Sequence, residues 1–280
     1  TGLEITDEKL FFFASTVREV INILNKQSEN IKQTSEMQPA ANWQEILRNI
    51  QVENMAKIIS LKPGLLAKIA NILLFPILSA IGYVMFWLKV KGKNNIPSKG
   101  PLIFCPNHTS YLDAPLLAIA LGMPTLLNTY FLGYSAYLDH PCLKWSKKLF
   151  RLISLDPASE LDETLKQCSF ILRNSKMLCM FPEGSRSVDG EIKDFKRGVG
   201  ILIKELNVAV IPVYINGTHR AWPVHRLLPR PAKVEISFGK KIMPEDLMAE
   251  HINEIDIYGK IAYNLKRNLL QLKEQTDKGI

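Results

Sequence analysis

The sequence feature that most constrains this chain is an apolar run that ends in a short polar loop. The run covers Leu102 to Cys105 and is closed by Pro106, a pattern that is typical of a buried strand. The Asn, Thr, Ser and Asp residues that follow predict a loop, and the apolar residues from Ala114 to Leu121 predict a helix. The loop is therefore expected at the carboxyl end of a strand, where α/β folds bind their ligands.

Two residues of this loop, His108 and Asp113, have the chemistry of a general base. A turn between them can bring the carboxylate onto one imidazole nitrogen and leave the other nitrogen free to take a proton. By itself such a pair is more often structural than catalytic, so the interpretation depends on what the rest of the chain places beside it.

A second apolar run, Met177 to Phe181, also ends in a turn, and this turn carries charges of both signs at positions 182–187. A basic cluster follows and leads into a helix predicted for Val199 to Leu206. Cations beside the free N–H groups of a helix start favour an anionic ligand such as a phosphate. The basic side chains of the cluster are Lys193, Lys196 and Arg197.

Three segments together resemble the glycerolipid acyltransferase family, which includes the lysophosphatidic acid acyltransferases. They are Asn107-His108 with Asp113, the Phe-Pro-Glu-Gly-Ser-Arg-Ser segment at 181–187, and the strand from Val210 to Val213. The resemblance implies an enzyme that moves an acyl group from a thioester, on coenzyme A or acyl carrier protein, to the hydroxyl of a lipid. It implies no metal and no cofactor.

The resemblance also implies roles for individual residues. His108 would take the proton of the acceptor hydroxyl, and Asp113 would fix the tautomer of the imidazole. Arg186 would hold a phosphate, while Glu183 would bind glycerol or orient the arginine. A serine hydrolase that uses Ser110 is the rival interpretation, but the chain has no Gly-x-Ser-x-Gly elbow. The other candidate substrate-binding residues are Asn107, Gly184, Ser187, Lys196 and Arg197.

One departure from the family pattern leaves the acceptor open. Members that act on lysophosphatidic acid usually carry a phosphate-binding arginine after a Phe-Ile-Asp type sequence, whereas the corresponding residues here are Leu155, Asp156 and Pro157. This version is similar to the acyltransferase part of the bifunctional acyl-carrier-protein synthetase and 2-acylglycerophosphoethanolamine acyltransferase. The acceptor could be 1-acylglycerol 3-phosphate, 2-acylglycerophosphoethanolamine or glycerol 3-phosphate. Four cations could replace the missing arginine: Arg151, Lys193, Lys196 and Arg197.

The charge of the chain points to an anionic partner. Its formal net charge of +8 suits nucleic acid, acidic lipid or phosphorylated small molecules. Lysines flank an apolar run, and no nucleic-acid module with interleaved basic and aromatic residues is present, so an anionic membrane surface is favoured. The cysteines lack short paired spacings and are interpreted as reduced core thiols in a cytosol-facing compartment: Cys105, Cys142, Cys168 and Cys179.

The chain divides into four segments. Residues 1–25 resemble the last part of an acyl carrier domain, although a simple helical appendage is the alternative, and we expect them to follow on from a longer polypeptide. Residues 26–41 are a polar linker. Residues 42–88 are amphipathic and hydrophobic helices associated with a membrane, and residues 89–280 are the acyltransferase domain.

The membrane-associated segment has two parts. A helix that begins near Trp43 and ends near Pro63 and Gly64 has one apolar side, which could lie on a membrane or pack on the domain. The uncharged run from Ile69 to Leu88 is long enough to span a bilayer, but we expect Pro76 and Gly82 to interrupt it. Because a single crossing would also separate the carrier-like segment from the domain, we expect helices immersed in one leaflet at the cytoplasmic face, with a buried core helix as the alternative.

The body of the chain alternates strands and helices, which predicts an α/β fold with a mostly parallel sheet covered on both faces. The aromatic segment 126–137 is expected in the core, with an acyl tunnel as the alternative. Apolar residues between Ile252 and Leu272 recur at helical spacing and predict a helix that docks on the sheet or on a partner. A membrane-anchored lipid-binding module without catalysis is the remaining functional alternative.

Overall fold

The computed structural model describes residues 42–61, 64–134, 151–155, 161–226, 228–249 and 256–278. The carrier-like segment 1–25 and the linker 26–41 lie outside these residues, so both stay predictions. The unit that contains the sheet begins at Trp43.

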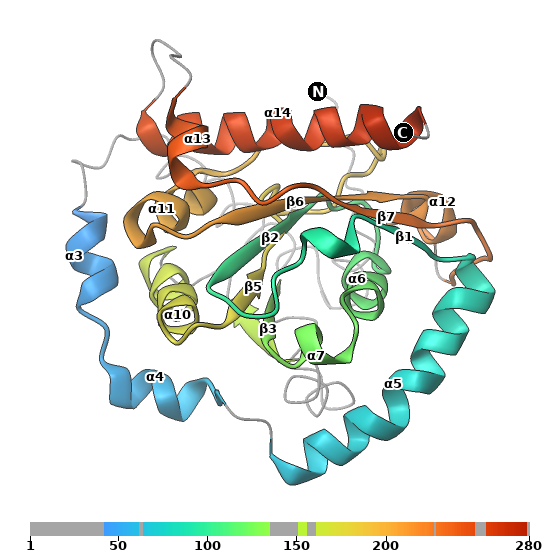
Figure 1. Cartoon of the computed structure of the whole chain (residues 1–280), viewed down its shortest axis with the longest axis horizontal. Helices are drawn as coiled ribbons and strands as arrows, with labels where there is room; N and C mark the ends of the chain where they lie inside the picture. Colours follow the sequence, from blue (N-terminus) through green and yellow to red (C-terminus); the bar gives the residue numbers. More distant parts are fainter. Residues whose placement is uncertain are drawn as a thin grey trace, which may run out of the picture. The chain divides into compact units, whose positions relative to one another are not determined.

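A seven-stranded sheet, shown in Figure 1, forms the centre of this unit, with the strand order β1-β7-β6-β2-β5-β3-β4. Strands β2 to β6 run parallel to one another, whereas β7 is antiparallel to β6 and parallel to β1. The mostly parallel sheet is confirmed. The strands are β1 (Lys89–Lys91), β2 (Leu102–Pro106), β3 (Thr129–Tyr134), β4 (Leu152–Leu155), β5 (Met177–Cys179), β6 (Val210–Asn216) and β7 (Glu235–Phe238).

Helices cover both faces of the sheet, as predicted. Because side chains alternate along a strand, Ile103 and Cys105 of β2 face one core, and Leu102 and Phe104 face the other. The first core is closed by α3 (Trp43–Arg48), α4 (Val52–Ile58), α10 (Leu161–Arg173), α11 (Arg197–Leu206), α13 (Pro244–Met248) and α14 (Ile257–Asp277). The second is closed by α5 (Leu65–Phe86), α6 (Asp113–Leu121), α7 (Met123–Leu126) and α12 (Thr218–Ala221), and η1 (Lys93–Asn95) is a short 3-10 helix after β1.

The aromatic segment 126–137 belongs to the core where it is described. Its residues Thr129–Tyr134 form β3, which pairs with β5 on one side and with β4 on the other. Tyr130 and Phe131 are both buried, in opposite cores. Neither β3 nor β4 was predicted as a strand, because neither run has the clear boundaries that Pro106 gives to β2.

The single helix predicted to begin near Trp43 and to end near Pro63 is two short helices, α3 and α4. The backbone of Gln51 leaves the helical region, with φ −72° and ψ 87°, so the chain bends before Val52. Leu47, Met55 and Ile59 are buried in the core of the domain. The structure thus supports packing on the domain for the apolar side of this segment.

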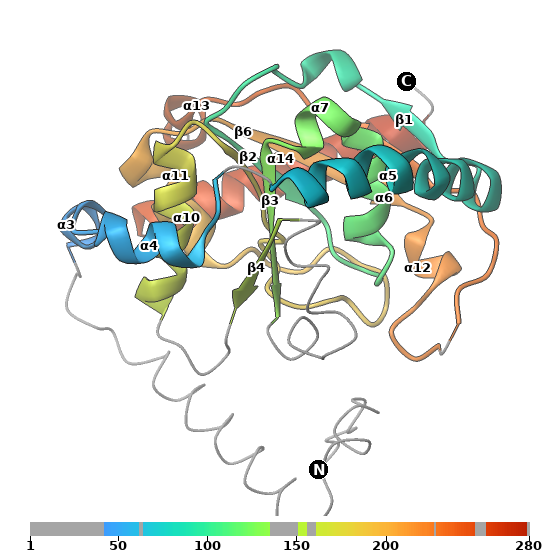
Figure 2. The same ribbon diagram turned by 90° about the horizontal axis from the view of Figure 1, so that it is seen from below.

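The prediction that Pro76 and Gly82 interrupt the next run was wrong, because both lie inside the continuous helix α5. A Cβ atom on Gly82 would lie 2.8 Å from Cδ1 of Ile119, so glycine here allows α5 to approach α6 closely. Figure 2 shows α5 beside α6. Within the described residues, no helix combines the length and the apolar character that a membrane span requires. Many apolar side chains of α5 are nevertheless exposed, among them Ile72, Leu73, Ile77, Ile81 and Val84.

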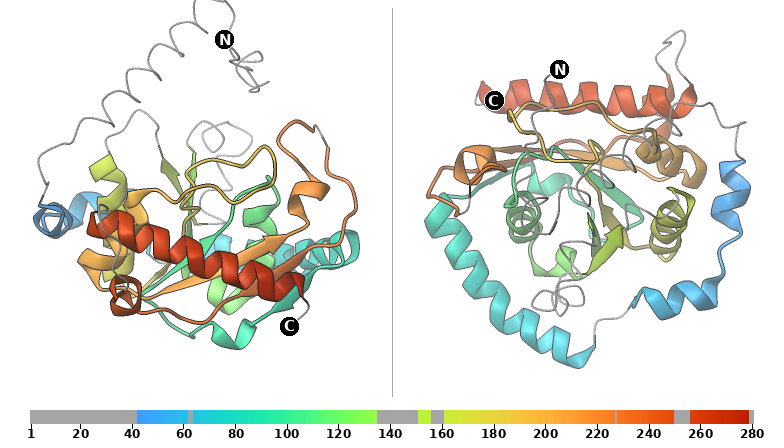
Figure 3. Two further views of the ribbon diagram at one scale, coloured as in Figure 1. Left: turned by 90° about the horizontal axis from the view of Figure 1, so that it is seen from above. Right: turned by 180° about the vertical axis from the view of Figure 1, so that it is seen from behind.

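The carboxyl-terminal helix docks on the sheet, one of the two arrangements expected for it. Figure 3 shows α14 running beside α11, and Ile261, Leu265 and Leu269 of α14 are buried in the shared core. The side chain of Asp256 caps the helix by accepting hydrogen bonds from the N–H groups of Tyr258 and Gly259. Ile252 and Ile255, which were expected in this helix, lie outside the described residues.

Candidate active site

The carboxyl ends of β2, β5 and β6 meet at one edge of the sheet, which we call the catalytic edge. Asn107, directly after β2, fixes the first loop to β6. Its Nδ2 atom donates to the carbonyl oxygen of Ile215 at 3.0 Å, and its Oδ1 atom accepts from the Ile215 N–H at 2.7 Å. Because Asn107 is buried and both polar atoms of its side chain are used, the structure gives it a positioning role, although it was predicted to bind substrate.

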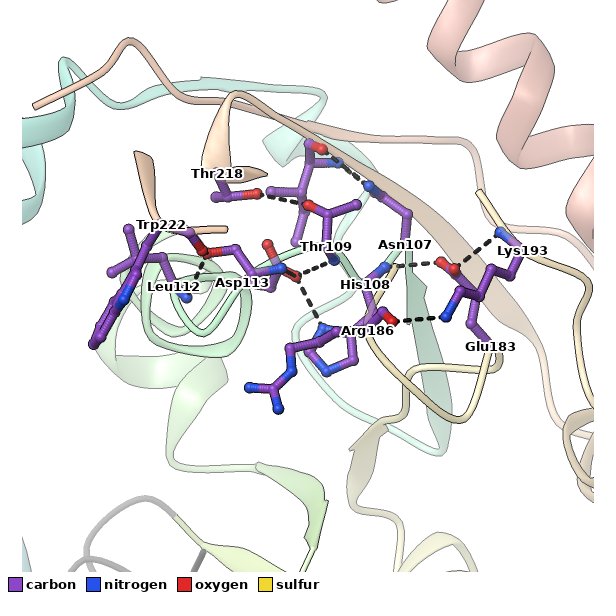
Figure 4. Close-up of polar contacts among 12 residues, drawn as sticks. Asn107, His108, Thr109, Leu112, Asp113, Glu183, Arg186, Lys193, Thr218 and Trp222 are labelled. Carbon is purple, nitrogen blue, oxygen red and sulfur yellow. Dashed lines mark hydrogen bonds and ion pairs between the residues drawn. The ribbon is translucent and has the colours of Figure 1, made fainter. Parts of the chain in front are cut away.

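His108 and Asp113 form the predicted pair, as Figure 4 shows. Nδ1 of His108 lies 2.9 Å from Oδ2 of Asp113, and the same oxygen accepts hydrogen bonds from the N–H groups of Thr109 and Ser110 at 2.7 and 2.8 Å. The Asp113 side chain is fully buried at the start of α6, whereas that of His108 is 22% exposed. The His108 ring stacks on Phe181 with centroids 3.9 Å apart. Nδ1 is therefore occupied, and Nε2 is the ring nitrogen left for a substrate.

Glu183 lies in the loop that follows β5, which we call the second loop, and it holds the backbone of His108. One carboxylate oxygen accepts from the His108 N–H at 2.8 Å, and the other accepts from the Lys193 N–H at 2.9 Å. On its other side, the His108 carbonyl oxygen accepts from the Ser187 N–H at 2.8 Å. Glu183 is only 2% exposed, so both of its oxygens are used inside the protein. This geometry favours a brace for the catalytic loop over either predicted role, the contact with glycerol or the orientation of Arg186.

The pKa of Glu183 gives a test of this brace. Burial raises the pKa from 4.5 to about 7, although the two backbone N–H groups act in the opposite direction. A carboxyl group with a raised pKa stabilises the fold below its unfolded pKa, and this contribution is lost as the pH rises through about 7. A shift of this size corresponds to roughly 3 kcal/mol.

We therefore expect the stability advantage of the wild type over Glu183→Gln to shrink between pH 5 and 8. Glutamine carries no charge, and it offers only one acceptor oxygen to the two backbone N–H groups. The measurement is the free energy of unfolding of both proteins by urea across this range. A difference in the free energy of unfolding that stays constant or grows with pH would contradict the raised pKa of Glu183.

Ser187 was predicted to bind substrate, but it is part of the turn itself. Its hydroxyl is buried, donates to Oδ1 of Asp189 at 2.6 Å and accepts from the N–H of Gly190 at 2.9 Å. Gly184, by contrast, is exposed at the tip of the loop and has a positive φ of 76°, a conformation that favours glycine. Of these two residues, only Gly184 is accessible to a ligand.

Arg186 lies beside His108 on an aromatic support (Figure 4). Its guanidinium carbon is 3.7 Å from the centre of the Tyr111 ring, and that ring packs at 5.2 Å against Trp222. Trp222 is tied to the first loop, because its carbonyl oxygen accepts from the Ser110 hydroxyl at 2.7 Å. Sequence reasoning missed Tyr111 and Trp222. The available signal was that Tyr111 lies between His108 and Asp113, and that Trp222 follows the strand β6.

The three cations of the predicted basic cluster have different surroundings in the structure. Lys193 supports the second loop by donating from Nζ to the carbonyl oxygen of Arg186 at 2.7 Å. Lys196 is exposed at the start of α11, and its backbone N–H donates to the carbonyl oxygen of Pro182. Arg197 forms an ion pair with Asp256 at 3.1 Å and so faces α14. Lys196 is the cation of this cluster that the geometry leaves available for an anion beside the loop.

Arg151 cannot replace the missing arginine of the family pattern. It precedes β4, so it lies at the edge of the sheet opposite to the catalytic edge. Its Nη2 atom donates to the carbonyl oxygen of Leu61 at 3.2 Å, and its guanidinium group packs over Tyr130. The prediction that Arg151 could take the place of that arginine was therefore wrong. Asp156 and Pro157, which raised the question, lie outside the described residues.

The described cysteines lie away from this chemistry. Cys105, Cys168 and Cys179 are buried free thiols, and burial raises the pKa of each, for Cys168 to about 12. They are accordingly core side chains. The described residues contain no group of three His, Cys, Asp or Glu side chains arranged to hold a metal ion.

Comparison with known proteins identifies the domain. Residues 88–216 match the family model described as Acyltransferase. This segment is an acyltransferase domain. It contains the His108–Asp113 pair and the Glu183–Arg186 loop, and it extends from the end of α5 to the end of β6.

Relatives of the acyltransferase domain include two plant enzymes. One is a chloroplast 1-acyl-sn-glycerol-3-phosphate acyltransferase of Arabidopsis thaliana, 30% identical over 50% of this chain and 39% of the relative. The other is a 1-acyl-sn-glycerol-3-phosphate acyltransferase of Limnanthes douglasii, 26% identical over 68% of this chain and 67% of the relative. The chain thus spans about two fifths of the length of the Arabidopsis relative.

The fold of the chain also matches a solved structure. The 1-acyl-sn-glycerophosphate acyltransferase of Thermotoga maritima superposes with a TM-score of 0.55, covering 82% of this chain and 95% of that one. The two sequences are 22% identical, so this match concerns the fold alone.

Proposed function

We propose that this chain transfers a fatty acyl group from a thioester, on coenzyme A or acyl carrier protein, to the hydroxyl of a lysophospholipid. The observation that carries the proposal is the His108–Asp113 pair, with Nε2 free and Arg186 beside it. The names of the relatives favour 1-acylglycerol 3-phosphate as the acceptor, in phospholipid biosynthesis.

The chemistry follows from the geometry of the pair. Nε2 of His108 takes the proton of the acceptor hydroxyl while the oxygen attacks the carbonyl carbon of the thioester. The Asp113 carboxylate stabilises the resulting imidazolium through Nδ1. When the C–S bond breaks, the thiolate leaves and takes the proton from His108, which restores the neutral ring. No covalent acyl-enzyme is needed, because the acceptor itself is the nucleophile.

Arg186 is the group that we assign to the acceptor's phosphate. A guanidinium group can donate two hydrogen bonds to a phosphate, and its position beside His108 brings the glycerol hydroxyl within reach of Nε2. Lys196 adds a second positive charge at the same loop. Because Pro157 replaces the usual arginine, 2-acylglycerophosphoethanolamine and glycerol 3-phosphate stay alternative acceptors.

The cation–π contact between Arg186 and the Tyr111 ring leads to a prediction. Replacing Tyr111 with leucine should raise the KM for a phosphate-bearing acceptor about 3- to 30-fold, because the arginine loses its cation–π contact. The value of kcat should change much less. Tyr111→Phe keeps the ring face and should behave like the wild type, which makes it the matched control. If both variants raised the KM equally, the hydroxyl rather than the ring would be the important group.

The surface of α5 supports association with a membrane. Its exposed apolar side chains form a continuous face, and lysines flank the helix in the sequence. We propose that α5 lies in one leaflet of an anionic membrane, at the cytoplasmic face, where the basic flanks meet the headgroups. If residues 1–25 belong to an acyl carrier domain, the donor could be delivered from the same polypeptide.

The function is tested by incubating the protein with labelled acyl-CoA or acyl carrier protein and a panel of acceptors. The panel contains 1-acylglycerol 3-phosphate, 2-acylglycerophosphoethanolamine and glycerol 3-phosphate, and His108→Ala is the control. We expect a diacyl product, or a monoacyl product from glycerol 3-phosphate, that depends on His108. Free fatty acid as the sole product would show hydrolysis. Lipid binding without any product, equal in both proteins, would favour the non-catalytic module.

A further inference from the structure

A strongly basic loop borders the catalytic edge, and its cationic side chains have no role in the mechanism above. We call residues 217–233 the basic loop; of these, Leu227 is outside the described residues. It contains no aspartate or glutamate. Within the described part of the chain, no ion pair involves any of its lysine or arginine side chains. All of these side chains are exposed: Arg220, Arg226, Arg230 and Lys233.

The loop has a defined structure, which keeps its charges in place. The Trp222 ring N–H donates to the carbonyl oxygen of Arg226 at 2.8 Å, so the indole fixes the middle of the loop. Arg230 is anchored to α12, because its Nε atom donates to the carbonyl oxygen of Arg220 and its backbone N–H to that of Ala221. Between the two arginines, Leu228 is 69% exposed. An apolar side chain thus stands at the surface among cations.

Both ends of the loop lie at the catalytic edge, next to the end of α5. The loop starts after β6 and leads into β7, where Asn216 and Glu235 are paired. Its last residue is followed by Val234, whose N–H donates to the carbonyl oxygen of Phe86 at 2.9 Å. The neighbouring side chains at the end of α5 are exposed, Val84 by 74% and Trp87 by 55%. The basic loop is therefore continuous with the apolar face of α5, and Figure 1 shows α12 close to the end of α5.

From this arrangement we infer that the basic loop docks on anionic phospholipid headgroups and turns the catalytic edge toward the membrane. An apolar helix bordered by unpaired cations and a protruding leucine matches a surface in which negative charge overlies hydrocarbon. An acidic protein partner would match the cations but would leave Leu228, Val84 and Trp87 without apolar contacts. The inference rests on the proposed association of α5 with a membrane, and it does not depend on which lipid is the acyl acceptor.

The test compares two charge reversals in vesicle flotation assays. Arg226→Glu with Arg230→Glu changes the basic loop, and Lys240→Glu with Lys241→Glu is the matched control. The control residues are also exposed, but they follow β7 at the opposite edge of the sheet. On phosphatidylcholine vesicles that contain phosphatidylglycerol, the loop variant should bind at least about 30-fold more weakly than the wild type. The control variant should bind like the wild type, and on pure phosphatidylcholine the three proteins should be alike.

Two results would overturn the inference. One is a loop variant that binds anionic vesicles as well as the wild type. The other is a control variant that is weakened as much as the loop variant, since binding would then follow total charge. Thermal unfolding shows whether the variants are folded, and Arg226→Gln with Arg230→Gln replaces a variant that is not. Acyl transfer to a micellar acceptor is measured separately, so a failure of the proposed function leaves the vesicle result interpretable.

Discussion

Replacing His108 with alanine should lower the kcat of acyl transfer by about a thousandfold to ten-thousandfold. The acceptor hydroxyl is a weak nucleophile while it keeps its proton, and Nε2 of His108 is the group placed to take that proton. The loss should fall on kcat, because Arg186 and Lys196 still hold the acceptor. Initial rates at saturating donor and acceptor measure the effect.

The same variant should fold normally. Glu183 and Ser187 bind the backbone N–H and carbonyl oxygen of residue 108, and alanine keeps both groups. Only the ring contact with Phe181 and the bond to Asp113 are lost. A loss of activity with an unchanged unfolding profile is therefore attributable to chemistry. Near-normal transfer by a folded His108→Ala protein would contradict the mechanism.

Replacing Asp113 with asparagine should lower kcat about a hundredfold to ten-thousandfold. The amide oxygen can still accept the N–H bonds of the loop, but it carries no charge to stabilise the imidazolium of His108. Asp113→Ala should lose as much activity and should also be destabilised, by about 2–5 kcal/mol, since the buried N–H groups of Thr109 and Ser110 would lack an acceptor. Steady-state kinetics and urea unfolding separate the two effects.

Ser110 provides the control for these variants and for the hydrolase interpretation. Its hydroxyl is buried, donates to the Trp222 carbonyl oxygen and accepts the Leu112 N–H at 3.1 Å, so it is not placed to attack a substrate. We expect Ser110→Ala to keep kcat within about tenfold of the wild type. A loss as large as that of His108→Ala would instead support a serine nucleophile.

The part of the fold that could be predicted from sequence is the part with clear local boundaries. The strand β2, the loop after it and the helix α6 were predicted because an apolar run, a proline and polar residues follow one another directly. The strands β3 and β4 were not, since their apolar runs merge into neighbouring segments. Pro76 misled the prediction of α5, because a proline removes one helical hydrogen bond but need not end a long helix.

The contacts of the site divide in a similar way: some are set by one short loop, and others join segments that are distant in the sequence. The contact between His108 and Asp113 depends on one short loop, so their spacing was enough to predict it. The brace from Glu183 and the contact of Trp222 with the first loop depend on β5 and β6 lying on either side of β2. No local pattern encodes that strand order. For this reason the family resemblance led to the prediction that Glu183 contacts glycerol or orients Arg186, whereas the structure places both of its oxygens on the backbone.

The reversal of direction between β6 and β7 has a consequence for variation among related proteins. In a parallel pair, the connecting segment must cross the whole sheet, and its length is bound to that distance. Here the connection leaves and re-enters at the same edge, so residues can be inserted or removed without shifting any strand. The part of this connection beyond Trp222 can thus change in length while the strands that carry the catalytic residues keep their positions.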